Sequence, residues 1–154
     1  MAIVYFDSSA LVKLIVEEAG SPLAADLWDG CDAALSSRLA YPEVRAALAA
    51  AGRNGDLNRV ELAAAELAWE EYWAATRPVE LSSEVERHAG RLARTYALRG
   101  ADAVHLASAL ALSDPELVFA VWDERLHGGA SAARLQVAPR ELVPYLAGGG
   151  EDAG

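Results

Sequence analysis

Two hydrophobic patterns occur along the 154-residue chain. Short continuous apolar runs at residues 3–6, 33–35 and 117–122 are typical of strands covered on both faces, as in parallel sheets. Elsewhere, apolar residues recur every three or four positions and predict a helix beginning near Ser8 and further helices over residues 39–51, 57–75, 83–100 and 101–112. Strands that alternate with helices predict an α/β fold with a mainly parallel central sheet.

Local signals mark where some of these helices begin and end. Gly52 follows the apolar stripe of the second helix and can supply its C′ cap. Ser83 opens a Ser-Glu-Val-Glu sequence, which has the spacing of a capping box at the start of the fourth. Within the third helix, Trp69, Tyr72 and Trp73 lie at helical spacing, which favours core packing; the alternative is a groove for a partner's helix.

Length and composition indicate a single domain. The chain has 53% hydrophobic and 23% charged residues, an ordinary globular balance, and it is long enough to bury one core. We expect one domain over residues 1–146. The last eight residues, AGGGEDAG at 147–154, are expected to form a disordered acidic tail.

Charge and cysteine content narrow the classes of function. The formal net charge of −10 disfavours loose binding of polyanions, so a nucleic-acid site would need local positive charge or bound cations. Cys31 is the only cysteine, which excludes an internal disulfide and a cysteine-based zinc site and suits a reducing cytosol. No signal peptide is recognisable, and no segment approaches the roughly 20 apolar residues that span a bilayer. We therefore expect a soluble, cytoplasmic protein.

Four acidic residues occupy comparable places in the predicted layout. Asp7 and Asp123 directly follow the first and last strands, while Glu43 and Asp102 lie in the first turns of two helices. In an open parallel sheet, the carboxyl ends of the strands and the amino ends of the following helices share one edge, where such folds bind ligands. We therefore expect Asp7 and Asp123 to share that edge, and Glu43 and Asp102 can join them.

Each acid alone has a structural explanation, because acidic residues are favoured at helix N-caps and in first turns. Four carboxylates together repel one another unless some are protonated or a cation lies among them. Oxygen ligands without cysteine suit Mg²⁺ or Mn²⁺ rather than zinc. Such a site can receive a phosphate, polarise it and activate a water for hydrolysis.

The four acids lie within motifs of one known family. In order along the chain, the matching stretches are YFDSSALVKL with Asp7, YPEVRAAL with Glu43, GADAVHLASAL with Asp102 and VWDERL with Asp123. The chain resembles the PIN-domain ribonucleases, and most closely the VapC-type toxins of bacterial toxin–antitoxin pairs. No single motif is specific, but the ordered set is.

The resemblance implies a three-layer α/β/α fold, Mg²⁺- or Mn²⁺-dependent hydrolysis of RNA, homodimerisation and inhibition by a cognate antitoxin. By position, the four acids would be the catalytic metal ligands, and Ser9 would support the water and metal shell. Family members often have a threonine two residues before the fourth acid, where this chain has Val121. A supporting hydrogen bond to Asp123 is therefore not expected from that side chain.

Basic side chains and one histidine are further candidates. Arg87, Arg91 and Arg94 form a stripe on the polar face of the fourth helix, either solvated or in contact with RNA phosphates or an antitoxin. Lys13, the only lysine, either extends to solvent or reaches a scissile phosphate. His105, one turn after the third acid, can be a partly buried structural residue, a metal ligand or an acid–base group.

Two other functions account for parts of the pattern. A non-catalytic acidic interaction domain, whose acids only cap helices, would tolerate Asp7→Asn and would not be stabilised by Mg²⁺ or Mn²⁺. A phosphatase of the haloacid dehalogenase type also begins with a strand ending in aspartate, but it needs a second aspartate where this chain has Ser9. The chain contains no phosphate-binding glycine loop, no G-x-S-x-G elbow and no H-E-x-x-H helix, which excludes those classes.

Overall fold

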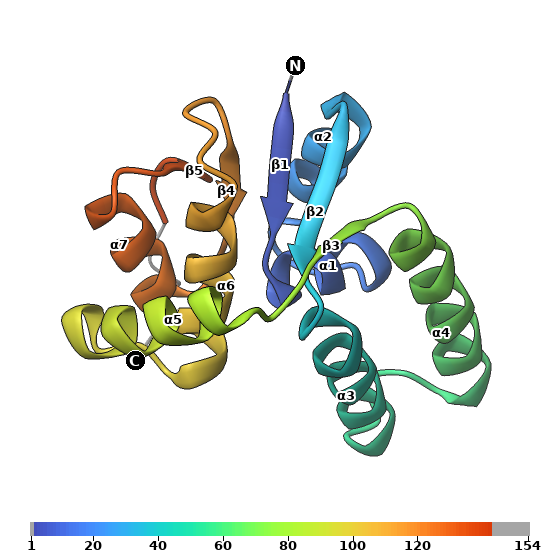
Figure 1. Ribbon diagram of the computed structural model, residues 1–154. Coiled ribbons are helices and arrows are strands. Elements are labelled where there is room, and N and C mark those ends of the chain that lie inside the picture. The colour runs from blue at the N-terminus through green and yellow to red at the C-terminus, as the bar shows by residue number, and fades with distance from the viewer. Residues whose placement is uncertain (1, 143–154) are drawn as a thin grey trace, which may run out of the picture.

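The computed structural model describes residues 2–142, which form a parallel sheet with helices on both faces (Figure 1). The strands are β1 (Ile3–Phe6), β2 (Ala33–Ser37), β3 (Arg77–Val79), β4 (Val118–Ala120) and β5 (Gln136–Ala138). The helices are α1 (Ser8–Ile15), α2 (Ser21–Gly30), α3 (Ala40–Arg53), α4 (Arg59–Ala74), α5 (Ser83–Tyr96), α6 (Gly100–Ala111) and α7 (Glu124–Ala132). The acidic tail expected over residues 147–154 lies outside the described residues.

Alternate residues of the central strands point into two separate cores. Val4 and Phe6 of β1 pack among residues of α1, α2, α3 and α4 on one face of the sheet. Tyr5 and Phe119 lie on the other face, where they pack among residues of α5, α6 and α7, and their rings stack at 5.3 Å. Because both faces are buried, the strands are apolar throughout, and the predicted three-layer α/β/α architecture is confirmed.

The strand order creates a switch point beside β1. The five strands are arranged β3-β2-β1-β4-β5, and every pairing between neighbours is parallel. The chain thus builds outward from β1 in one direction through β2 and β3, and in the other through β4 and β5. The helices α1 and α3 begin where β1 and β2 end, at the lower edge of the sheet in Figure 1. This is the edge at which open parallel sheets bind ligands.

Several predicted boundaries are wrong in detail. The helix predicted over residues 83–100 ends at Tyr96 as α5. α3 continues through Gly52 to Arg53, so Gly52 is not the C′ cap. A Cβ at Gly52 would lie 2.8 Å from Cδ2 of Leu62, so this glycine instead permits close packing of α3 against α4. The N-cap of α5 is Ser82 rather than Ser83, and its hydroxyl accepts a hydrogen bond from the N–H of Val85 at 3.2 Å. The last predicted strand, residues 117–122, is shorter as β4.

The aromatic residues of α4 contribute to the core, as the helical spacing predicts. Trp69 is fully buried, and its ring lies 5.5 Å from that of Trp73 and 6.0 Å from that of Tyr41 in α3. Tyr72 and Trp73 are half-buried and pack against the same cluster.

None of the helices in the described part of the chain combines the length and the apolar character that crossing a membrane requires.

Candidate metal and catalytic site

Asp7 and Asp123 each begin a helix at the carboxyl edge of the sheet. Asp7 directly follows β1 and caps α1, where its Oδ1 accepts a hydrogen bond from the N–H of Ala10 at 2.9 Å. Asp123 caps α7 after β4, and its Oδ1 accepts from the N–H of Leu126 at 2.9 Å. Since β1 and β4 are paired neighbours, the two caps start from the same edge.

All four predicted acids line one cavity of about 260 Å³. Glu43 reaches it from the first turn of α3, and Asp102 reaches it from the first turn of α6. Ser9 also lines the cavity, as the resemblance to the PIN family suggests. His105, a candidate from the sequence, also lines the cavity, together with Ser8 and Arg99, whose place there was not predicted.

Asp7 is the most deeply buried of these acids. Its side chain is almost inaccessible, with the residue 4% exposed, and the loss of solvent raises the pKa of its carboxyl to about 6. The hydroxyl of Ser9 donates to the carboxylate at 2.9 Å from Oδ1 and 3.0 Å from Oδ2. The electrostatic effect of His105 and the hydrogen bonds from Ala10 and Ser9 lower the pKa of Asp7, but they do not overcome the effect of burial.

Glu43 is held by a hydrogen-bond chain that starts at Tyr5, in the core beneath α5, α6 and α7. The hydroxyl of Tyr5 lies 2.9 Å from Nδ1 of His105, and Nε2 of His105 lies 2.7 Å from Oε1 of Glu43. A carboxylate only accepts, so Nε2–H donates to Glu43, and in the neutral ring Nδ1 accepts from the Tyr5 hydroxyl. Ser8 donates to the same Oε1 at 2.6 Å. Partial burial would raise the pKa of Glu43, but these hydrogen bonds outweigh it and leave the pKa lowered.

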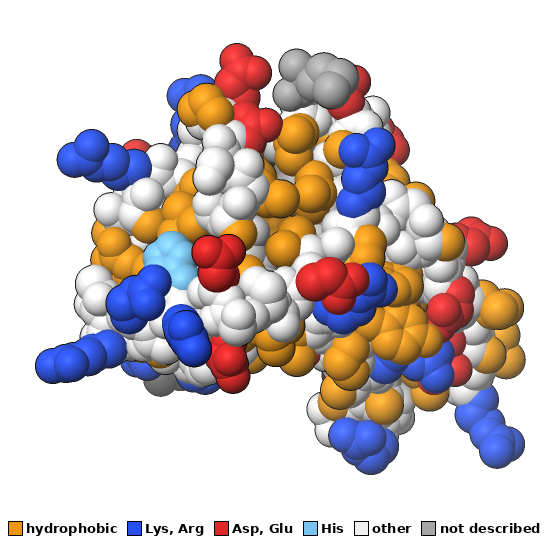
Figure 2. Space-filling view, viewed as in Figure 1, with side chains coloured by type: hydrophobic (Ala, Val, Ile, Leu, Met, Phe, Trp, Pro, Cys, Tyr) orange, Lys and Arg blue, Asp and Glu red, His pale blue; other side chains and the backbone are white. Residues whose placement is uncertain are grey.

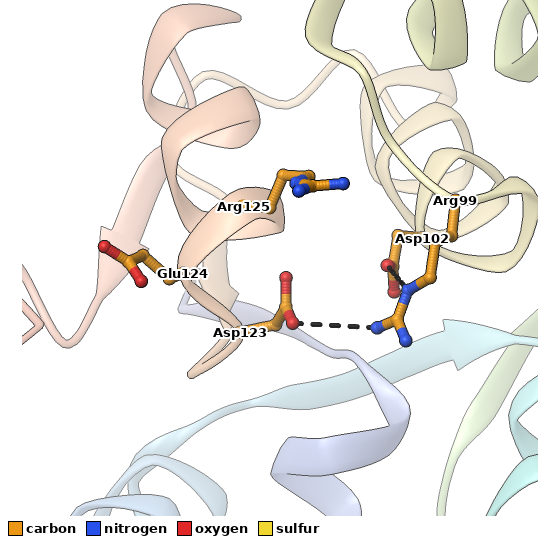
Figure 3. Close-up of a pocket in the computed structure, with 5 residues that line it drawn as sticks. All are labelled: Arg99, Asp102, Asp123, Glu124 and Arg125. Carbon is orange, nitrogen blue, oxygen red and sulfur yellow. Dashed lines mark hydrogen bonds and ion pairs between the residues drawn. The ribbon is translucent and has the colours of Figure 1, made fainter. Parts of the chain in front are cut away.

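Arg99 links the other two acids. Its Nε donates to Oδ2 of Asp102 at 3.0 Å, and its Nη2 lies 3.6 Å from Oδ2 of Asp123 (Figure 3). The guanidinium therefore lies between carboxylates that come from the first turn of α6 and from the N-cap of α7. These three residues also border a larger cavity of about 610 Å³, into which Arg125 extends from α7.

The chemistry of the donor set fits a hard divalent cation. Carboxylate oxygens and serine hydroxyls are the ligands that Mg²⁺ and Mn²⁺ prefer, and Asp102 and Asp123 already attract one cationic group. The four carboxylates are each turned toward protein donors rather than toward one point. Accordingly, within residues 2–142 no three acid, histidine or cysteine side chains form a group ready to share one ion.

The basic side chains predicted to contact RNA do not line the acidic cavity. Lys13 does not line the cavity; its Nζ pairs with Glu18 at 2.9 Å and lies 5.3 Å from the ring centroid of Trp122. The stripe on α5 is exposed to solvent along its length: Arg87, Arg91 and Arg94. Two of them border a separate cavity of about 430 Å³ between α5 and α6. Figure 2 shows blue basic side chains gathered over the part of the surface where α5 lies.

A family model described as "PIN domain" matches residues 4–126, and the chain belongs to this family. Its curated relatives include Ribonuclease VapC45 of Mycobacterium tuberculosis strain CDC 1551 / Oshkosh and Ribonuclease VapC49 of strain ATCC 25618 / H37Rv. Each is 72% identical to this chain over 144 residues, covering 94% of it and 100% of the relative.

Solved structures share the fold at low sequence identity. FitAcB from Neisseria gonorrhoeae has a TM-score of 0.66 and 18% identity, covering 87% of this chain and 95% of its own. A toxin-antitoxin complex from Klebsiella pneumoniae has a TM-score of 0.62 and 16% identity, with 91% and 99% coverage. PAE2754 from Pyrobaculum aerophilum has a TM-score of 0.61 and 22% identity, with 90% and 93% coverage. The PIN-like α/β fold expected from the sequence is thus confirmed.

Proposed function

We propose that this protein is a metal-dependent endoribonuclease toxin that hydrolyses RNA phosphodiester bonds. The proposal is carried by one observation: four acids from four separate segments line a single cavity at the switch point of the sheet. The names of its relatives support the choice of RNA, because proteins 72% identical over nearly the whole chain are named ribonucleases. A phosphatase with a second aspartate is excluded by Ser9, which bonds to Asp7 instead.

The four acids Asp7, Glu43, Asp102 and Asp123 would hold Mg²⁺ or Mn²⁺. A bound divalent cation supplies charge that polarises the phosphoryl oxygens and lowers the pKa of a coordinated water. Around it, Ser9 and the N–H of Ala10 fix the position of the Asp7 carboxylate.

His105 and Ser8 hold Glu43 in a comparable way. Both contacts use Oε1, and Oε2 receives no hydrogen bond from the described residues. The histidine and the serine therefore position one carboxylate oxygen and leave the other without a hydrogen bond from the described residues. In this proposal His105 is a positioning residue, because it acts through Glu43 rather than on the substrate.

Cleavage of total cellular RNA by the purified protein tests the activity. The reaction is run with Mg²⁺, with Mn²⁺ and with EDTA, beside Asp7→Asn and Asp102→Asn, and the new 5′ ends are sequenced. A matched control is Asp26→Asn, the same change at an exposed position in α2. Metal-dependent cuts that persist in Asp26→Asn and vanish in the two site variants would support the nuclease.

The contrary result has a definite meaning. If Asp7→Asn cleaves as well as the wild type, the cleavage does not depend on Asp7 and the proposed metal site is refuted. A protein without activity whose thermal stability also fails to respond to Mg²⁺ or Mn²⁺ would instead be the acidic interaction domain considered above.

RNA contact is assigned, within this proposal, to Arg87, Arg91 and Arg94 on α5, with Lys13 as a further candidate. The exposure of the stripe and its contrast with a net charge of −10 support it. Because each lost phosphate contact reduces the salt dependence of binding by roughly 0.7 for single strands, the double change Arg87→Gln/Arg91→Gln should lower that slope by about 1.4. Binding is measured in the inactive Asp7→Asn background, with Arg53→Gln as the control.

An antitoxin and a second copy of the chain are the proposed protein partners. Large apolar side chains are exposed on α4, with Val60 79% and Leu67 71% exposed, and can bind an apolar helix. Val60→Ser/Leu67→Ser should weaken neutralisation by a co-expressed antitoxin without changing RNA cleavage.

Light scattering after gel filtration tests the homodimer. The cytoplasm is the proposed location, because a toxin that acts on cellular RNA finds its substrate there.

A further inference from the structure

Arg99 has the position of a built-in cation in the candidate site. It is the N-cap residue of α6, it makes no side-chain capping bond there, and its side chain is 72% exposed. Nothing buries this side chain, yet it turns back onto the acidic edge and contacts Asp102 and Asp123 together. Its guanidinium is therefore the protein's own counter-charge for two of the four acids.

The two carboxylates are brought together by the fold rather than by their own attraction. Asp102 is fixed in the first turn of α6, and Asp123 is fixed as the N-cap of α7. Without a cation between them they repel each other, so the contact with Arg99 relieves a cost that the fold creates. A divalent cation at the same oxygens would relieve the same cost, and the two positive groups cannot share them.

We propose that Arg99 competes with the divalent cation for Asp102 and Asp123, so that this side chain sets the metal affinity of the site. The inference rests on the proposed metal site. When the guanidinium leaves the two carboxylates, the adjoining 610 Å³ cavity can receive it, since Arg99 already borders that space together with Arg125 (Figure 3). Arginine is suited to this role because its planar fork reaches two carboxylates at once.

The competition predicts effects of opposite sign in the two forms of the protein. Arg99→Gln removes the counter-charge, so the metal-free protein should melt at a lower temperature than the wild type. The same change removes a competitor and a repulsive charge, so the dissociation constant for Mn²⁺ should fall on the order of tenfold. If Arg99 only supported the fold, Arg99→Gln would lower both the melting temperature and the affinity for Mn²⁺.

The experiment measures Mn²⁺ binding by titration calorimetry and thermal unfolding in EDTA for the full chain. Arg125→Gln is the matched control. Arg125 is an exposed arginine that lines the same cavity, but it contacts the Ala97 carbonyl rather than the acids. Its Mn²⁺ affinity should change less than twofold. Arg99→Lys keeps the charge but loses the fork, and its affinity should lie between those of the wild type and Arg99→Gln.

The outcomes separate the inference from the function on which it rests. If the wild type binds Mn²⁺ and Arg99→Gln binds it equally or more weakly, the competition is refuted while the metal site stands. If Arg125→Gln tightens binding as much as Arg99→Gln, the effect is one of general charge, and the competition is refuted as well. If the wild type does not bind Mn²⁺, the metal site and the competition both fail.

Discussion

Replacing Asp7 by asparagine should stabilise the folded protein at neutral pH. The carboxyl of Asp7 is buried, and burial raises its pKa from 3.8 to about 6. Between those values the folded protein binds the proton more tightly than the unfolded chain. The favourable contribution of this group to stability is therefore fully present below about pH 4 and is lost as the pH rises through about 6.

The magnitude follows from the size of the pKa difference. About two pKa units correspond to roughly 3 kcal/mol of stability lost above pH 7 by ionising Asp7 in the folded state. Asparagine is uncharged at every pH, keeps an oxygen for the N–H of Ala10 and the hydroxyl of Ser9, and is among the best N-cap residues. Asp7→Asn should therefore gain up to about 3 kcal/mol at pH 7.5 and about half of that near pH 5.

Urea denaturation of the metal-free protein at both pH values measures this gain, with tryptophan fluorescence as the signal. The exposed Asp26→Asn change serves as the control and should alter the free energy of unfolding by less than about 0.5 kcal/mol at either pH. A variant that is less stable than the wild type at pH 7.5 would refute the reasoning. So would a gain of equal size at both pH values, because the burial of a charge would then not be its cause.

Three further changes test core packing, a helix cap and a tight turn elsewhere in the fold. Trp69→Ala removes a fully buried ring and should cost about 3–5 kcal/mol in urea denaturation, whereas a phenylalanine at this position should cost clearly less. Asn58→Ala breaks the capping box with Glu61 at the start of α4 and should cost about 1 kcal/mol, seen also as lower helicity by circular dichroism. Gly20→Ala should cost about 1–3 kcal/mol, because φ is +92° there and the new Cβ would lie 2.6 Å from Nε1 of Trp122; unchanged melting would contradict this.

The elements that carry the acids could be predicted because their signals are local. The apolar run before Asp7 ends abruptly at a charged residue, and the same change occurs before Asp123. Strand pairing then brings β1 and β4 side by side, a consequence of the parallel topology rather than of any single residue. The prediction that the acids share one edge needed only the alternation of strands and helices.

The missed elements α2, α7, β3 and β5 are short and have weak local signals; α2, for example, has no side-chain cap at its start. β3 and β5 have three residues each, and β3 is an edge strand that contains Pro78. α7 contains two glycines, which disfavour helices. A Cβ at Gly129 would lie 3.4 Å from Tyr96 and 3.5 Å from Leu98, which is ordinary van der Waals contact, so close packing does not explain this glycine.

Within the site, Arg99 and the partners of His105 could not be predicted from the sequence. Arg99 precedes a helix, and no pattern indicates that its side chain turns toward Asp123. His105 is hydrogen-bonded to Tyr5, which lies 100 positions away in the sequence. Such contacts depend on how two layers of the fold meet, and hydrophobic periodicity contains no information about them.

The hydrogen-bond chain from Tyr5 through His105 to Glu43 couples the packing of the buried core to the position of a carboxylate in the candidate site. Tyr5 stacks on Phe119, so a change of volume at Phe119 would tilt the tyrosine ring and move the Glu43 carboxylate without altering any cavity residue. A genetic selection for loss of toxicity should therefore recover substitutions at Phe119 and Tyr5 that leave the protein folded. It should recover them beside the expected changes at the acids.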